Sequence, residues 1–210
     1  MTPISAPDDV SALWLLTLQR AVARASHDVK DAMNGVSVNL EVIRSRAARP
    51  DTPASDVAKF GEAAAQQLDR LTTLLDAILT LSKADRASAD VGVTLRRVIA
   101  LCGAASSVAD ARIQLVDESS MRSTTTRVLG DVVRLALTSP LLEVAVASHH
   151  AQRASDVTCV LSADAAAVRV VIAAPGRRAL MPESIVDVVR SAGVSFTEGP
   201  QDLSLTFPSV

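Results

Sequence analysis

The chain has 210 residues, a formal net charge of −2 and 2% aromatic residues, whereas 49% of its residues are hydrophobic. This is enough apolar chain for a buried core in one large domain or two small ones. Without a basic patch the sequence excludes a typical nucleic-acid-binding surface. No stretch approaches the roughly 20 apolar residues of a membrane span, and the first residues lack a signal-peptide pattern. A cytoplasmic protein without a nucleic-acid or membrane partner is therefore predicted.

A long helix is predicted from about Asp9 to Ala48. Apolar or small residues recur along it every three or four positions, which is the spacing of a coiled-coil seam. These seam residues are Leu15, Leu18, Val22, Ser26, Val29, Met33, Val36, Leu40 and Ile43. The helix should end at Pro50, after which Thr52 can cap a second helix with Pro53 in its first turn.

The second helix is predicted to extend to about Ala84. Its seam consists of Val57, Phe60, Ala64, Leu68, Leu71, Leu75 and Ile78. A short loop between two long helices gives an antiparallel hairpin. Because one hairpin cannot cover a seam on each helix, we expect residues 1–86 to form a four-helix bundle with a second copy of the chain. The sequence thus predicts a homodimer.

A polar hinge is expected at residues 84–92, followed by a second domain over residues 93–210. Helices are predicted at 95–102, 131–148 with an interruption at Pro140, and 182–192, and strands at 112–116, 157–161, 168–173 and 203–207. These elements indicate a small α/β sandwich with helices on one face of a mixed sheet. The predicted fold class is therefore α+β. Cys102 and Cys159 have no metal-ligand spacing and are predicted to be buried, small apolar residues.

Three histidines are the candidates for chemistry. His149 and His150 end a predicted helix and are expected to be solvated. His27 lies in the middle of the first helix, one place off the seam, and a neutral imidazole there is a competent nucleophile toward phosphorus. An ordinary solvated histidine is the alternative reading. The polar surroundings of His27 favour a nucleophile. Asp28 follows it directly, Lys30 is one turn on, and Asp31, Asn34 and Val38 share the face of His27.

The segment Ser26 to Glu41, SHDVKDAMNGVSVNLE, resembles the H-box of two-component sensor histidine kinases. The helix containing Leu68 to Ser82 resembles the second helix of the same dimerisation and phosphoacceptor domain, so that the resemblance covers residues 10–85. Ala32 stands where the family usually has proline, which predicts a straighter helix. Asp31 stands where threonine or asparagine serves phosphatase activity in the family, so the resemblance does not imply that activity.

The second half resembles the ATP-binding domain of these kinases in layout, without its nucleotide contacts. Val144 stands where the family has the Mg²⁺-binding asparagine, Ile172 where it has the adenine-reading aspartate, and Ala174 where it has a glycine. Residues 180–195 contain no glycine-rich lid. Metal and positioning supply most of the catalysis in phosphoryl transfer, and a carboxylate is the charged acceptor for the adenine amino group. The resemblance therefore predicts a degenerate domain that does not bind ATP.

The resemblance as a whole implies a histidine phosphotransfer protein, a phosphotransferase without autokinase activity. It would relay phosphoryl groups between response-regulator receiver domains through His27. In this prediction His27 and Asp28 are catalytic, and Lys30, Asp31, Asn34 and Val38 bind the receiver. No cofactor or metal is expected in the chain, because the receiver brings its own Asp and Mg²⁺. Two alternatives are a kinase-like scaffold that is never phosphorylated and a true kinase with unusual nucleotide contacts.

Overall fold

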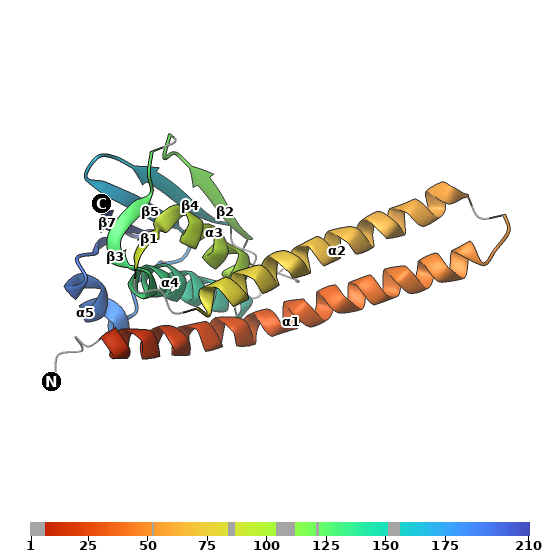
Figure 1. Cartoon of the computed structure of the whole chain (residues 1–210), viewed down its shortest axis with the longest axis horizontal. Helices are drawn as coiled ribbons and strands as arrows, with labels where there is room; N and C mark the ends of the chain where they lie inside the picture. The colour runs from red at the N-terminus through yellow and green to blue at the C-terminus, as the bar shows by residue number, and fades with distance from the viewer. Residues whose placement is uncertain (1–6, 52, 84–86, 104–111, 121, 151–155) are drawn as a thin grey trace.

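The computed structural model describes residues 7–51, 53–83, 87–103, 112–120, 122–150 and 156–210. It consists of a long helical hairpin and an α/β domain that packs against the open end of the hairpin (Figure 1). This arrangement confirms the predicted α+β class. Within the described residues, no helix combines the length and the apolar character that crossing a membrane requires.

The hairpin is formed by α1 (Pro7–Ala47) and α2 (Ala54–Leu81). Both helices run without a break, and α1 passes through Ala32 as a continuous helix. The residue before α2 is Pro53, which has extended backbone angles and makes no side-chain cap. Thr52, which was expected to cap α2, lies outside the described residues, as does the predicted helix end at Ala84.

The face of α1 that packs inside the chain differs from the predicted seam. Its buried residues are Trp14, Leu18, Ala21, Ala25, Asp28 and Ala32, spaced three and four apart. Leu15, Met33 and Leu40 of the predicted seam are instead 53–55% exposed. The buried face is rich in alanine, and small side chains allow close helix packing, so the larger seam residues lie on a second, outward face. Only Leu18 of the predicted seam is fully buried.

The α/β domain contains three helices and two sheets. The helices are α3 (Val91–Cys102), α4 (Gly130–His150) and α5 (Glu183–Ser191). A two-stranded sheet pairs β1 (Ser88–Asp90) with β3 (Thr125–Leu129). The larger sheet has the order β2-β4-β5-β7-β6, formed by Arg112–Asp117, Asp156–Ala163, Ala167–Ala173, Asp202–Pro208 and Ser195–Glu198. Its β2–β4 pair is parallel and the others are antiparallel, which confirms a mixed sheet.

The described part of the segment predicted to be a hinge belongs to the α/β domain. Residues 88–90 form β1, and α3 begins at Val91, four residues earlier than expected. The reason is a cap: the Asp90 carboxylate accepts a hydrogen bond from the Val93 backbone N–H at 2.8 Å and from Thr124 Oγ1 at 2.7 Å. Gly92 allows this approach, because a Cβ there would lie 2.9 Å from Thr124 Oγ1.

A single apolar core joins the sheet, the three helices and the start of the hairpin. Inward residues alternate along β4, β5 and β7, ending at Phe207, which is fully buried. The helix α4 continues through Pro140, where an interruption was expected. Every residue from Asp131 to Leu142 is buried. Packing on all sides therefore offsets the backbone hydrogen bond that proline cannot make.

Cys102 and Cys159 are free and buried, as predicted. Burial raises the pKa of each thiol to about 12. Since the thiolate is the reactive form, we expect an aromatic disulfide reagent at pH 8 to label neither cysteine in the folded protein and both after unfolding in guanidinium chloride. Rapid labelling of the folded chain would contradict the packing of the α3–β4 region.

Candidate functional site

His27 lies in the middle of α1 with its side chain exposed. One turn before it, the helix contacts the α/β domain: the Arg24 guanidinium donates from Nη1 to the Cys102 carbonyl oxygen at 3.2 Å. Ala25 is fully buried on the adjoining side of the helix. His27 therefore projects outward one turn beyond this contact with the second domain.

The polar residues predicted to surround His27 are exposed with it. Asp31, Asn34 and Val38 follow His27 at intervals of four, three and four residues, which places them on one face of the helix. Lys30 is also exposed, and Val38 is 62% exposed. The structure thus brings five of the six predicted site residues onto one accessible surface, which we call the His27 face: His27, Lys30, Asp31, Asn34 and Val38.

Asp28 is the exception. Its side chain is 7% exposed, and it belongs to the buried face of α1 together with Ala25 and Ala32. Successive residues of an α-helix point about 100° apart, since the helix has about 3.6 residues per turn. Asp28 therefore points toward the inside of the chain, whereas the His27 side chain is exposed.

The residues that the sequence resemblance places at nucleotide-contact positions lie in the core. Val144 on α4 is 3% exposed, and Ile172 and Ala174 at the end of β5 are fully buried. The loop that follows β5 turns inward: Ala179 is fully buried and Met181 is 4% exposed. Its Met181 N–H donates to Glu198 Oε1 at 2.9 Å. The side chains of Val144, Ile172, Ala174, Ala179 and Met181 all belong to one apolar cluster.

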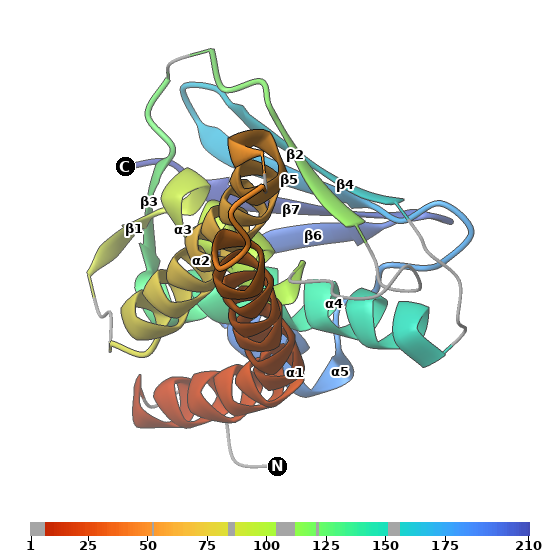
Figure 2. The ribbon, with the colours of Figure 1, turned by 90° about the vertical axis from the view of Figure 1, so that its right-hand side faces the viewer.

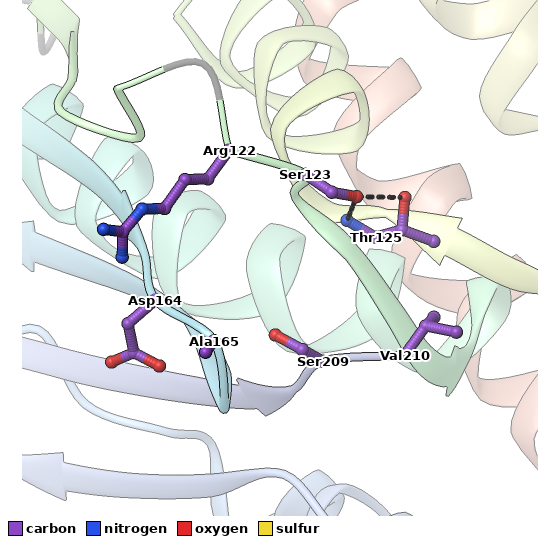
Figure 3. Close-up of a pocket in the computed structure, with 7 residues that line it drawn as sticks. All are labelled: Arg122, Ser123, Thr125, Asp164, Ala165, Ser209 and Val210. Carbon is purple, nitrogen blue, oxygen red and sulfur yellow. Dashed lines mark hydrogen bonds between the residues drawn. The ribbon is translucent and has the colours of Figure 1, made fainter.

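Open pockets lined by described residues lie elsewhere on the α/β domain. The one drawn in Figure 3 has a volume of about 390 Å³ and lies between β3, the β4–β5 turn and the end of β7. Its lining residues are Arg122, Ser123, Thr125, Asp164, Ala165, Ser209 and Val210. The neighbouring pocket shares Arg122 with it. Hydrogen bonds from the Ala166 and Ala167 backbone lower the pKa of Asp164, so its carboxylate is ionised. Neither pocket includes Val144 or Ile172.

Metal binding is not indicated by the described part of the chain, where no three His, Cys, Asp or Glu side chains gather in a group that could hold an ion. His149 and His150 form the end of α4, as predicted, but their side chains lie outside the described residues.

Several polar residues at the contact between the hairpin and the α/β domain were not predicted from the sequence. They are Ser11, Trp14, Arg24, Asp131 and Arg134. A signal was present in two places: Trp14 is the only tryptophan of the chain, and Asp131 and Arg134 form a charged pair in the first turns of a helix rich in apolar residues. Their partners are far away in sequence, so the pattern alone could not identify the contact.

The hairpin is similar in sequence to a known protein family. Residues 17–87 match the model of the His Kinase A (phospho-acceptor) domain. The hairpin therefore resembles a phosphoacceptor domain in sequence, as the residues around His27 predict. No curated protein matches the chain.

Three solved structures that are similar to the chain each share 12% sequence identity with it. One is histidine kinase ThkA in complex with response regulator protein TrrA, with a TM-score of 0.45 and coverage of 93% of this chain. Another is the Acinetobacter baumannii histidine kinase AdeS, with a TM-score of 0.37 over 87% of this chain and 96% of that chain. A third, a bacterial phosphotransferase, has a TM-score of 0.38 over 97% of this chain and 98% of that chain. The chain spans 63% of the length of the ThkA chain.

Proposed function

We propose that the protein is a dimeric histidine phosphotransfer protein that accepts a phosphoryl group on His27 from one receiver domain and passes it to another. The observation that carries the proposal is the exposed imidazole of His27, within a hairpin that matches a phosphoacceptor domain. In this mechanism the imidazole nitrogen attacks phosphorus as the receiver's aspartyl phosphate bond breaks, and the reverse step regenerates free imidazole. The receiver supplies the Mg²⁺ for both steps.

The exposed surroundings of His27 support docking of a receiver. The His27 face is polar around the histidine and ends in the apolar Val38, so it offers both charged and apolar contacts to a partner. A neutral imidazole is the form of the side chain that acts as a nucleophile toward phosphorus. Asp28, which directly follows His27 and lies on the buried side of α1, is proposed to orient the imidazole or share its proton.

The filled core of the α/β domain supports a protein that does not use ATP. The side chains of Val144, Ile172, Ala179 and Met181 occupy positions that would have to open for a nucleotide and its metal to enter. Val144 and Ile172 carry no ligand atom for Mg²⁺ or for the adenine amino group. The α/β domain is therefore proposed to have a structural role in this protein.

Titration calorimetry tests this part of the proposal directly. We expect no heat of binding when Mg-ATP is added at millimolar concentration to the full-length protein. An active histidine kinase of known nucleotide affinity serves as the positive control in the same buffer. A saturable isotherm in the micromolar range would contradict the proposal and favour a kinase with unusual nucleotide contacts.

A labelling experiment separates the proposed function from its alternatives. The protein is incubated with radiolabelled ATP or with a radiolabelled, phosphorylated receiver domain, and the label on each chain is measured. A phosphotransfer protein takes label from the receiver only. A kinase takes it from ATP, and a non-phosphorylated scaffold takes it from neither while still binding the receiver. Testing all receivers of the source organism identifies the partners.

The unpaired apolar face of the hairpin supports dimerisation. Met33 and Leu40 of α1 and Leu68, Leu75 and Leu79 of α2 are 44–64% exposed in the single chain. They recur at helical spacing and stay exposed although the α/β domain packs at the open end of the hairpin, where α2 ends (Figure 1). Two hairpins that pair through these faces make a four-helix bundle, in which all four apolar faces are buried.

A further inference from the structure

Side chains from both parts of the protein meet at the point where the chain leaves the hairpin. The last carbonyl groups of a helix lack partners within the helix. At the end of α2, the Leu81 carbonyl oxygen accepts a hydrogen bond from the Trp14 indole Nε1 of α1 at 3.1 Å. The Lys83 carbonyl oxygen accepts one from Arg134 Nη1 of α4. The end of α2 is thus capped from the hairpin and from the α/β domain at once.

The arginine that makes this cap is itself held in place. Arg134 and Asp131 are 6% and 3% exposed, and Arg134 Nη1 lies 3.3 Å from Asp131 Oδ1. The other carboxylate oxygen, Asp131 Oδ2, accepts a hydrogen bond from Ser11 Oγ of α1 at 2.9 Å. A continuous polar chain therefore runs from Ser11 through Asp131 and Arg134 to Lys83. Buried charges are tolerated only when paired and hydrogen-bonded, as here.

Apolar packing lies directly beside this polar chain. Trp14, Leu18, Ala21 and Ala25 are at most 5% exposed and belong to the same core cluster as α3 and α4. The first half of α1 runs along α4 in both views of the molecule (Figures 1 and 2). Residues 11–25 of α1 therefore complete the core of the α/β domain as well as one side of the hairpin.

We infer that the junction between the hairpin and the α/β domain is a closed latch, formed by Ser11, Trp14, Asp131 and Arg134 around the end of α2. The latch holds the two parts as one body. A domain that delivers a bound group to a residue on another domain must move toward it, and the latch opposes that movement. This inference goes beyond the proposed function, because it holds whether or not His27 is phosphorylated.

Hydrogen–deuterium exchange on the full-length protein tests the latch. The variants are Trp14→Phe, which removes the indole N–H and keeps a ring, and Arg134→Met, which removes the guanidinium and keeps the length. The double variant should exchange the amides of residues 11–25 and 78–83 about tenfold to a hundredfold faster than wild type. Hydrogen bonds that involve charged groups are among the stronger ones. Their loss lowers the free energy of local opening of these segments, which raises the rate of amide exchange.

Two control variants separate the latch from general surface effects. Arg127→Met removes an exposed arginine from β3. Arg20→Ala removes the 3.0 Å ion pair with Glu143, which crosses the same boundary but has side chains 64% and 49% exposed. Exposed pairs contribute little to stability, so neither control should accelerate exchange in residues 11–25 by more than about twofold.

The exchange rates of the latch variants and the controls test the latch independently of phosphotransfer. Faster exchange in the latch variants and not in the controls supports it. Unchanged exchange in the folded latch variants, or equal acceleration in the controls, overturns it. If the Arg134→Met variant does not fold because Asp131 loses its charged partner, Trp14→Phe combined with Ser11→Ala gives the same test. In that variant the Asp131–Arg134 pair is kept and no buried charge is left without a partner. His27→Ala should leave all these exchange rates unchanged, so a failure of the latch and a failure of the phosphotransfer proposal are distinguishable.

Discussion

Replacement of His27 by alanine is expected to abolish phosphoryl transfer from a phosphorylated receiver domain. In the proposed mechanism the imidazole is the covalent acceptor, and alanine offers no atom that can replace it. The measurement is the label transferred from a radiolabelled receiver to the protein after separation of the two chains. Because the His27 side chain is exposed and alanine favours helix, the stability of the variant should remain within about 0.5 kcal/mol of wild type.

Neighbouring variants distinguish chemistry from docking. Asp28→Asn should slow transfer by about 10²–10⁴-fold, the usual contribution of orienting or acid–base groups; its buried position requires that folding be checked by circular dichroism. Val38→Asp should weaken receiver binding but leave His27 reactive toward a small phosphoramidate donor, because Val38 lies about three turns away on the same exposed face.

The result for His27→Ala decides the central assignment. If the variant still accepts phosphate from a receiver, the acceptor is another residue and the assignment is wrong. If neither the wild type nor the variant accepts phosphate but both bind the same receiver, the protein is a scaffold. If His27→Ala loses both transfer and receiver binding, its reactivity toward the small phosphoramidate donor is compared with that of Val38→Asp. This comparison separates loss of the nucleophile from loss of the docking surface.

The long helices could be predicted from the sequence because their pattern is local and extends over many turns. The identity of their buried faces could not. The pattern of large apolar residues predicted a seam through Leu15, Met33 and Leu40, but the structure packs the alanine-rich face with Ala21 and Ala25 instead. A hydrophobicity pattern weights large side chains, whereas close helix packing within one chain selects small ones. The large residues then remain for a second partner.

Three short strands and the long-range polar contacts could not be predicted from the sequence. The strand β1 has three residues, too few to establish an alternating pattern, and the sequences of β3 (TTRVL) and β6 (SFTE) do not alternate between apolar and polar residues. The cap of α3 by Asp90 needs Thr124 to hold it, and the latch joins Arg134 to Lys83 across 51 positions. By contrast His27 and its exposed face could be predicted, because those residues are neighbours along one helix.

The apolar face left open on the hairpin gives the second prediction with a large effect. Leu68 and Leu75 are 53% and 44% exposed in the single chain, seven residues apart on the outward side of α2. In the proposed four-helix bundle they are buried against the second hairpin. Leu71, which lies between them, is already half-buried within the chain, so its replacement would damage the hairpin as well. Leu68→Asp with Leu75→Asp is therefore the sharper variant.

Wild type is expected to be a dimer at micromolar concentration, and the Leu68→Asp, Leu75→Asp variant a monomer, both measured by light scattering coupled to gel filtration. Full burial of a leucine side chain contributes about 1.5–3 kcal/mol. These leucines are already about half covered, so the four in a dimer account for about 3–6 kcal/mol, or a hundredfold to ten-thousandfold weaker association. Placing carboxylates in the interface weakens it further. Val38→Asp, which adds the same charge on the His27 face, should remain dimeric. A monomeric wild type would show that the exposed leucines serve another contact, and a double variant that stays dimeric would place the dimer interface elsewhere.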